Sequence, residues 1–176
     1  YLEKLATDTF HLPRLTEADF AVNDPKGLIG MVPGEILTEN KGYADSVDIS
    51  KDILKMAVIE RHKNTGHIGL GFLTGYGLKE GAVATSVAHD SHNIIVIGTN
   101  ETDMALAANH ICEVGGNVVV CDGKVIAQMP LPIAGLMSQR SGDEVARENE
   151  QVRSAVHTLG VNEGIEPFMN MAFVSL

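Results

Sequence analysis

The chain has 176 residues, 44% of them hydrophobic and 20% charged, a size and composition at which one globular domain buries a core without disulfides or a structural metal. Its formal net charge is −10, and without a basic surplus to release counterions we predict no binding to nucleic acid or to an anionic membrane. No apolar run reaches about 18 residues, so neither a membrane span nor a signal peptide is predicted.

The first forty residues are interrupted by six prolines and glycines, and short strands and turns are predicted there. The short apolar stretches 19–22 and 35–38 are the strand candidates. The chain starts at Tyr1 without a methionine and ends on the apolar run 171–176. Because a natural terminus is usually polar and frayed, we expect a piece of a longer protein.

Several strands are predicted in the middle of the chain. Residues 52–62 only partly alternate, so a strand and a short helix compete, and the β-branched residues favour the strand. Glycines are dense between Gly66 and Gly81, where residues 72–76 have the pattern of a strand. The uninterrupted apolar run 93–98 predicts a strand buried on both faces.

A helix and a hairpin follow. Asn100 is a suitable cap, apolar residues recur at helical spacing after it, and Gly115 stops the helix. Residues 117–121 and 124–129 are predicted to form a hairpin, because the Asp-Gly pair between them supplies the positive φ angles of a two-residue turn.

The last predicted helix opens at Ser141 with a capping-box spacing and ends at Gly160, and residues 168–176 are predicted to close the fold as a strand. We therefore expect a single compact α+β domain, with a mixed, mostly antiparallel sheet and two to three helices packed on it. Within this one unit we divide the chain into an irregular lead-in, residues 1–40, and the α+β domain proper, residues 41–176.

The two cysteines, Cys112 and Cys121, are too few for a disulfide framework and lack C-x-x-C spacing. Each lies within an apolar run, which is typical of a buried and inert thiol. A reduced, cytoplasmic setting is therefore expected.

One polar block stands out among the positions of the seven histidines. It contains His89, Asp90, Ser91, His92 and Asn93 and is followed immediately by the apolar residues 94–97. An aspartate can orient an imidazole, a histidine can move protons near neutral pH, and serine and asparagine can bind a polar ligand edge. The alternative is a polar turn, in which the same residue types bond locally to the backbone.

Other chemistry has weaker support. His-x-x-His places the two rings on opposite faces of a strand, and no further ligand lies nearby in sequence, while recruitment of His62, His67 or Glu60 has no support of its own. The glycine series fits no phosphate-binding pattern and more often permits tight turns or close backbone approach. Ser86 and Ser91 lack the flanking glycines of a nucleophile elbow.

Longer stretches of the chain resemble the C-terminal region of bacterial adenine deaminases, members of the amidohydrolase superfamily. The stretches that carry the resemblance are residues 29–38, 66–72, 77–82, 86–100, 129–138 and 166–169, which have that family's order and approximate spacing. The block from His89 to Asn93 is specific in this context.

The resemblance implies an enzyme that hydrolyses adenine to hypoxanthine and ammonia with a metal-activated water in a TIM barrel. Such a barrel needs about 250 residues, and this sequence contains no His-x-His pair of the kind that binds the metal. The chain is therefore expected to be the C-terminal portion alone, inactive by itself and without metal or cofactor residues. Manganese or iron would be held by the N-terminal barrel of the same polypeptide, in a cytoplasmic homo-oligomer serving purine salvage.

Within that interpretation, our hypothesis is that His89, Asp90, Ser91, His92 and Asn93 face the mouth of the barrel and help to enclose adenine or to order a subunit interface. The competing interpretation is that they only hold this domain together. A second function class stays open as well, an independent acidic binding or assembly module without catalysis.

Overall fold

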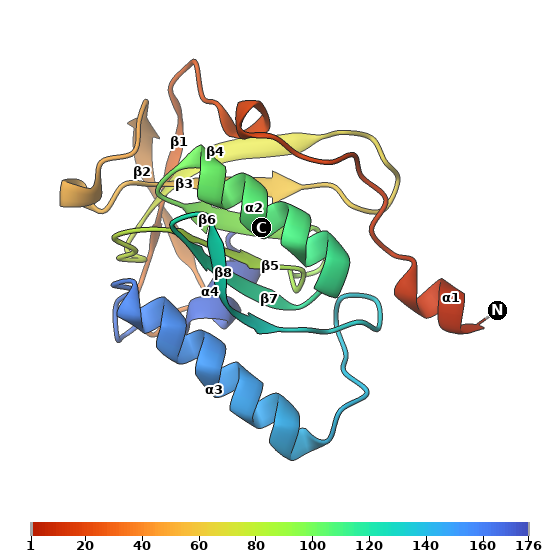
Figure 1. The fold of residues 1–176 in the computed structure, drawn as a ribbon. Coiled ribbons are helices and arrows are strands. Elements are labelled where there is room, and N and C mark those ends of the chain that lie inside the picture. The colour runs from red at the N-terminus through yellow and green to blue at the C-terminus, as the bar shows by residue number, and fades with distance from the viewer. Residues whose placement is uncertain (1, 176) are drawn as a thin grey trace.

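A single eight-stranded sheet forms the centre of the computed structural model, which describes residues 2–175 (Figure 1). The strands are β1 (Lys26–Met31), β2 (Thr38–Ala44), β3 (Leu54–Ile59), β4 (Ile68–Thr74), β5 (Ala82–Thr85), β6 (Ile94–Gly98), β7 (Asn117–Cys121) and β8 (Lys124–Met129). Their order across the sheet is β2-β1-β4-β3-β6-β5-β7-β8. The β1–β4 pair is parallel and the other neighbouring pairs are antiparallel, which confirms the predicted mixed, mostly antiparallel sheet.

Helices cover both faces of the sheet. They are α1 (Leu2–Thr7), α2 (Glu101–Val114), α3 (Gly142–Thr158) and α4 (Pro167–Phe173), with 3-10 turns η1 (Glu17–Phe20) and η2 (Ile49–Lys51). Helix α2 packs on one face of the sheet, whereas α3 and α4 pack on the other (Figure 1). The predicted α+β domain is thus confirmed. Among the described residues no helix is long and apolar enough to cross a membrane.

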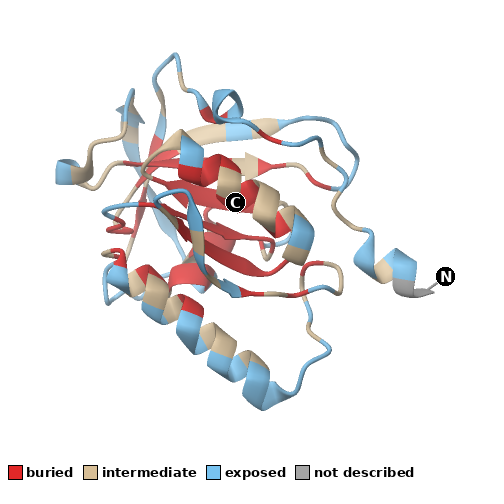
Figure 2. Cartoon of the chain, in the orientation of Figure 1, coloured by how far each residue is buried: buried red, intermediate tan, exposed pale blue. Residues whose placement is uncertain are grey.

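The central strands show why the sheet lies in the middle of the core (Figure 2). Ile94 and Val96 of β6 point to the face covered by α2, while Ile95 and Ile97 point to the face covered by α3 and α4. All five residues of β6 are buried, so the strand is buried on both faces as predicted. Each face of the sheet therefore has a hydrophobic cluster of its own.

The helix caps and the two-residue turn predicted from local sequence signals are confirmed. The Asn100 side chain accepts a hydrogen bond from the amide of Asp103 at 2.8 Å, and Gly115 caps the other end of α2. Ser141 and Glu144 form the predicted capping box of α3. Asp122 between β7 and β8 has the positive φ that the two-residue turn requires.

The predicted strand over residues 168–176 is wrong, because α4 occupies residues 167–173 (its last predicted residue, Leu176, lies outside the described part). The Glu166 side chain accepts a hydrogen bond from the amide of Met169, and Pro167 occupies the first turn, where its missing N–H costs nothing. Phe168, Met171 and Ala172 are buried with the spacing of one helix face.

Two smaller differences concern the lead-in and β4. Residues 17–20 form the 3-10 turn η1 instead of a strand, and of residues 35–38 only Thr38 begins β2. The strand predicted at 72–76 ends at Thr74, because Gly75 adopts a φ of 91° and its position leaves no room for a side chain beside the carbonyl of Met31.

Candidate functional site

The predicted polar block lies at one end of the sheet, which we call the site end. In an antiparallel sheet alternate loops meet at the same end, and here these are residues 60–67, 86–93 and 130–138 (right in Figure 1). The segment around residues 9–11 and the helix α4 also reach this end. Three of the stretches that carry the family resemblance therefore come together in space.

The polar block forms an ordered turn between β5 and β6. The amide of His92 donates to the carbonyl of Ala88 at 2.8 Å, and the His89–Asp90 peptide bond is cis. The amide of Asn93 donates to the Ser91 hydroxyl at 3.3 Å, which is the local bonding that a polar turn alone would explain. The Asp90 side chain, in contrast, is 96% exposed and makes no such bond to the backbone of residues 2–175.

A buried arginine that the sequence analysis did not single out holds this turn in place. Arg61 follows β3 and is 1% exposed. Its guanidinium donates to the backbone carbonyls of His92, Thr9 and Ala134 and lies 4.3 Å from the ring centroid of Phe10. No carboxylate pairs with it among the described residues, and burial lowers the pKa of Arg61. One side chain thus ties three loops of the site end together.

Histidines surround this arginine. His62 Nε2 lies 2.8 Å from the carbonyl of Ser91, and His11 Nδ1 lies 3.1 Å from the carbonyl of His62. The pKa of His92 is lowered by burial and by the charges of Arg61 and His89, so His92 is neutral at physiological pH. The pKa of His11 is raised by its bond to the His62 carbonyl and by Asp8.

Two polar atoms of the block are buried without a partner. Nδ1 of His92 and Oδ1 of Asn93 are covered, and neither makes a hydrogen bond to any residue in the described range. A buried polar atom left unpaired costs about 1–3 kcal/mol, and native proteins have few of them. These two atoms are therefore the place where the turn is incomplete within this chain.

An apolar cavity of about 310 Å³ adjoins the block. It lies between residues 87–89 and α4, with the start of β7 at one side. The His89 ring stacks on Phe173 with ring centroids 4.7 Å apart and 12° between the planes. The Nδ1 atom of His89 lies 2.8 Å from the carboxylate of Asp90, so the aspartate does orient an imidazole as the sequence suggested.

The described residues do not fit a metal ion. No group of three or more His, Cys, Asp or Glu side chains within residues 2–175 is arranged to hold one. Although partial desolvation opposes the shift, hydrogen bonds from Thr65 and from the amides of His62 and Lys63 lower the pKa of Glu60 to about 2. Glu60 therefore organises the loop after β3 and is not a free ligand.

The other candidates from the sequence have structural roles. Ser86 is buried, and its hydroxyl donates to the carbonyl of Gly135 and accepts from the amide of Gly116. Both cysteines are half-buried and not fully buried as predicted, and partial burial raises the pKa of both thiols, that of Cys112 to about 11, which disfavours the reactive thiolate. His67, the remaining histidine of the loop after β3, lies in the exposed part of that loop.

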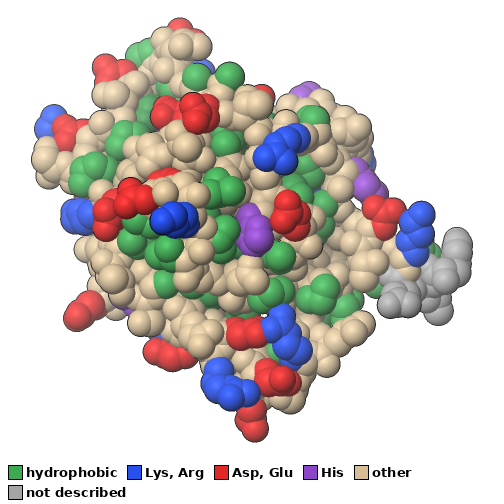
Figure 3. All heavy atoms as spheres, viewed as in Figure 1, with side chains coloured by type: hydrophobic (Ala, Val, Ile, Leu, Met, Phe, Trp, Pro, Cys, Tyr) green, Lys and Arg blue, Asp and Glu red, His purple; other side chains and the backbone are tan. Residues whose placement is uncertain are grey.

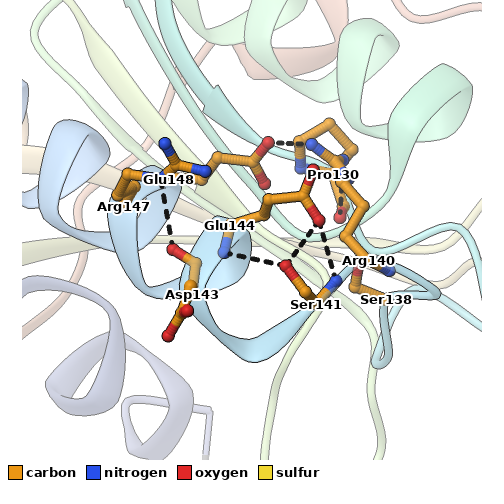
Figure 4. A network of polar contacts seen from close by, with 8 residues as sticks. All are labelled: Pro130, Ser138, Arg140, Ser141, Asp143, Glu144, Arg147 and Glu148. Atoms are coloured by element: carbon orange, nitrogen blue, oxygen red, sulfur yellow. Dashed lines mark hydrogen bonds and ion pairs between the residues drawn. The ribbon is translucent and has the colours of Figure 1, made fainter.

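The rim of the site end is fixed to α3 by a polar network (Figure 4). Arg140 pairs with Glu148, and its guanidinium reaches the carbonyl of Pro130, while Ser141 and Glu144 close the capping box. Acidic and basic side chains are scattered over the face of the molecule in Figure 3, which shows no continuous basic patch.

The fold and the site end together define an α+β domain that presents a fixed, histidine-rich turn and an adjoining cavity at one end of its sheet. Comparison with known proteins identifies the family. The family model described as the adenine deaminase C-terminal domain matches residues 34–176, so the chain belongs to the adenine deaminase C-terminal domain family. The resemblance predicted from the sequence is confirmed.

Curated relatives give the same result. The adenine deaminase of Brucella abortus (strain 2308) is 47% identical over 176 residues, covering 93% of this chain and 30% of that relative. The adenine deaminase of Nitratidesulfovibrio vulgaris (strain DP4) is 42% identical over 184 residues, covering 96% and 31%. That of Methanothrix thermoacetophila is 47% identical over 156 residues, covering 85% and 27%. The chain thus spans about 30% of the length of the curated relatives it matches.

Proposed function

We propose that this chain is the C-terminal portion of an adenine deaminase, which hydrolyses adenine to hypoxanthine and ammonia, and that its site end closes an active site built by the rest of the polypeptide. The observation that carries the proposal is the match of residues 34–176 to the family model, with relatives named adenine deaminase that are more than three times as long. If the function lay in this domain alone, it would not account for the larger part of each relative, which this domain does not cover.

The unpaired atoms at the site end support closure. Nδ1 of His92 and Oδ1 of Asn93 lack partners within the described chain, while Arg61 fixes the turn that carries them. A turn that served only this domain would gain by satisfying those atoms internally. We infer that the substrate or the neighbouring domain supplies their hydrogen bonds.

We assign the metal-dependent step to the N-terminal barrel, because the described residues of this chain lack metal ligands. Hydrolytic deamination needs an activated water, and a manganese or iron ion in the N-terminal barrel would supply it there. The described residues of this chain lack a ligand set for such an ion, so its part is to orient and enclose. His92 is held neutral, and with the amide of Asn93 it can bind the polar edge of a purine while the turn excludes water. The cytoplasmic setting and the homo-oligomer stay predictions.

The first test is turnover. Adenine deamination is followed by absorbance for the purified 176-residue chain and for the intact gene product, meaning everything its gene encodes before and after these residues, each with added Mn(II) or Fe(II). We expect turnover by the intact product and none by the chain. Turnover by the chain alone would contradict the division of labour, and an intact product without any turnover would contradict the proposed function.

The second test asks what the turn faces. Hydrogen exchange over residues 86–93 is compared between the chain and the intact gene product, with the β7–β8 turn at residues 122–123 as the matched control. We expect exchange of the first segment to slow in the intact product and that of the control to stay constant. Equal exchange of residues 86–93 in both proteins would contradict closure.

A further inference from the structure

We propose that the cavity between residues 87–89 and α4 is a binding site for an uncharged, planar nitrogen heterocycle of nucleobase size, formed by this chain alone. The inference deepens the proposed function, on which the choice of adenine as probe rests. The chemistry of the cavity is argued from its own walls.

The size and walls of the cavity favour a small flat ligand. Its volume of about 310 Å³ is at the lower end of the range of about 300–1,000 Å³ that is common for ligand pockets. Phe168, Ala172 and Phe173 of α4 contribute apolar surface, and Met169 stands at the rim with 56% of its surface exposed. The His89 ring, held parallel to Phe173, adds a flat aromatic wall for stacking.

A buried amide supplies an unused donor. Asn117 at the start of β7 lines the cavity and is only 4% exposed. Its Oδ1 accepts from the hydroxyl of Thr85 at 2.7 Å, and that hydroxyl in turn accepts from the amide of Val87. With Oδ1 engaged by this hydroxyl, no hydrogen bond joins Nδ2 to an acceptor among residues 2–175. This nitrogen is therefore available to donate to an acceptor on a ligand in the cavity.

The histidine supplies the complementary group. Nδ1 of His89 lies 2.8 Å from the Asp90 carboxylate, so in the tautomer that carries its proton on Nδ1 the other ring nitrogen, Nε2, is an acceptor. None of the described residues that line the cavity is a lysine or an arginine, so none of them compensates the charge of a phosphate. A donor, an acceptor and aromatic walls together match a free base, with ring nitrogens that accept and an amino group that donates. They do not match a nucleotide.

The test measures binding to the 176-residue chain, whose two hydrophobic clusters lie within it. Adenine, hypoxanthine and AMP are titrated by calorimetry and by NMR of the side-chain amides. We expect adenine to bind and to shift the Asn117 amide, and AMP to bind at least tenfold more weakly. Failure of adenine to bind, or AMP binding as tightly as adenine, would overturn the proposal.

Variants locate the site. Asn117→Leu removes the donor and is expected to weaken adenine binding at least tenfold, whereas Asn40→Leu, at an exposed asparagine on β2, leaves it unchanged. Since Asn117 also bonds Thr85, a second variant protects the test. Met169→Trp fills the mouth from an exposed position and is expected to abolish binding while the circular dichroism spectrum stays unchanged. Adenine binding that survives both changes contradicts the assignment.

The outcome is separable from that of the proposed function. If the intact gene product deaminates adenine but the 176-residue chain does not bind it, this inference is contradicted and the proposed function is supported. If the 176-residue chain binds adenine but the intact gene product has no deaminase activity, this inference is supported and the proposed function is contradicted.

Discussion

The two ends of the sheet satisfy their backbones in different ways. At the opposite end, which we call the turn end (left in Figure 1), the loops are rich in glycines with positive φ, and carboxylates accept some of their amide hydrogens. Asp52 accepts from the amides of Gly75 and Gly77, and Asp103 accepts from the amide of Gly123. At the site end, a buried arginine donates to backbone carbonyls of three separate segments, and two side-chain atoms of the polar turn stay unpaired.

This difference indicates a division of labour. At the turn end, the carboxylates of Asp52 and Asp103 are paired with backbone amides inside the chain. Side chains that serve an external partner keep groups free, at a cost in stability. The turn end therefore holds the fold together, and the site end is where we expect ligands and other domains. The predictions that follow test whether the two ends can be separated.

The largest effect is expected at the turn end, for Gly81→Ala. A Cβ on Gly81 would lie 2.2 Å from the carbonyl oxygen of Val120, and the residue has a φ of 78°. Overpacking and a strained φ together predict a loss of about 4 kcal/mol in the free energy of unfolding. Gly123→Ala is the control, because its φ of 69° is also positive but no atom lies within 4 Å, and about 1 kcal/mol is expected. Equal losses in chemical denaturation would contradict the account.

Arg61→Met is expected to have the next largest effect, and it belongs to the site end. The change leaves the carbonyls of His92, Thr9 and Ala134 without their donor, so we predict a loss of about 3 kcal/mol in unfolding free energy. Hydrogen exchange at residues 88–93 should also accelerate. The exposed Arg147 of α3 provides the control, since Arg147→Met should cost less than about 0.5 kcal/mol. Stability close to the original would show that Arg61 does not hold the loops.

Asp52→Ala, at the turn end, is expected to have a smaller effect on the free energy of unfolding. The amides of Gly75 and Gly77 lose their shared acceptor, which should cost about 2 kcal/mol. Asp52→Asn keeps one acceptor oxygen and is expected to recover about half of that loss. Thermal and urea denaturation measure both variants, and an asparagine variant as unstable as the alanine variant would argue against the role of the carboxylate.

The smallest effect is a difference in titration between two histidines of the site end. Burial, Arg61 and His89 hold the pKa of His92 below 6.5, so the unfolded chain takes up a proton first and stability is lost as pH falls below 6.5. His11 has a raised pKa, and its contribution is present below 6.5 and lost as pH rises through the folded pKa. NMR titration measures both. Arg61→Met should raise the pKa of His92 and leave that of His11 unchanged, and an unchanged His92 would contradict the contact.

Much of the fold could be predicted because its signals are local. The cap at Asn100, the capping box at Ser141 and the Asp122–Gly123 turn each depend on residues a few positions apart. The helix α4 was missed because a short apolar run fits strand and helix alike, although Glu166 before Pro167 is a capping signal that could have identified it.

The candidate site was only partly predictable. Its polar block can be recognised from its composition, but the residues that surround it in space are distant in sequence. Arg61 donates hydrogen bonds to carbonyls 31, 52 and 73 positions away in the sequence, and no local sequence pattern predicts such a residue. The free donor of Asn117 likewise depends on Thr85, 32 positions earlier. Pairing of this kind is a property of the folded chain and not of any short segment.

The most direct test of the division between the two ends is kcat/KM for adenine in the intact gene product, measured for His92→Ala and for Asp52→Ala. The account predicts a loss of at least tenfold, about 1.4 kcal/mol, for His92→Ala, and for Asp52→Ala an unchanged value per folded molecule despite its lower stability. Deamination at the original rate by His92→Ala, or an equal loss in both variants, would contradict it.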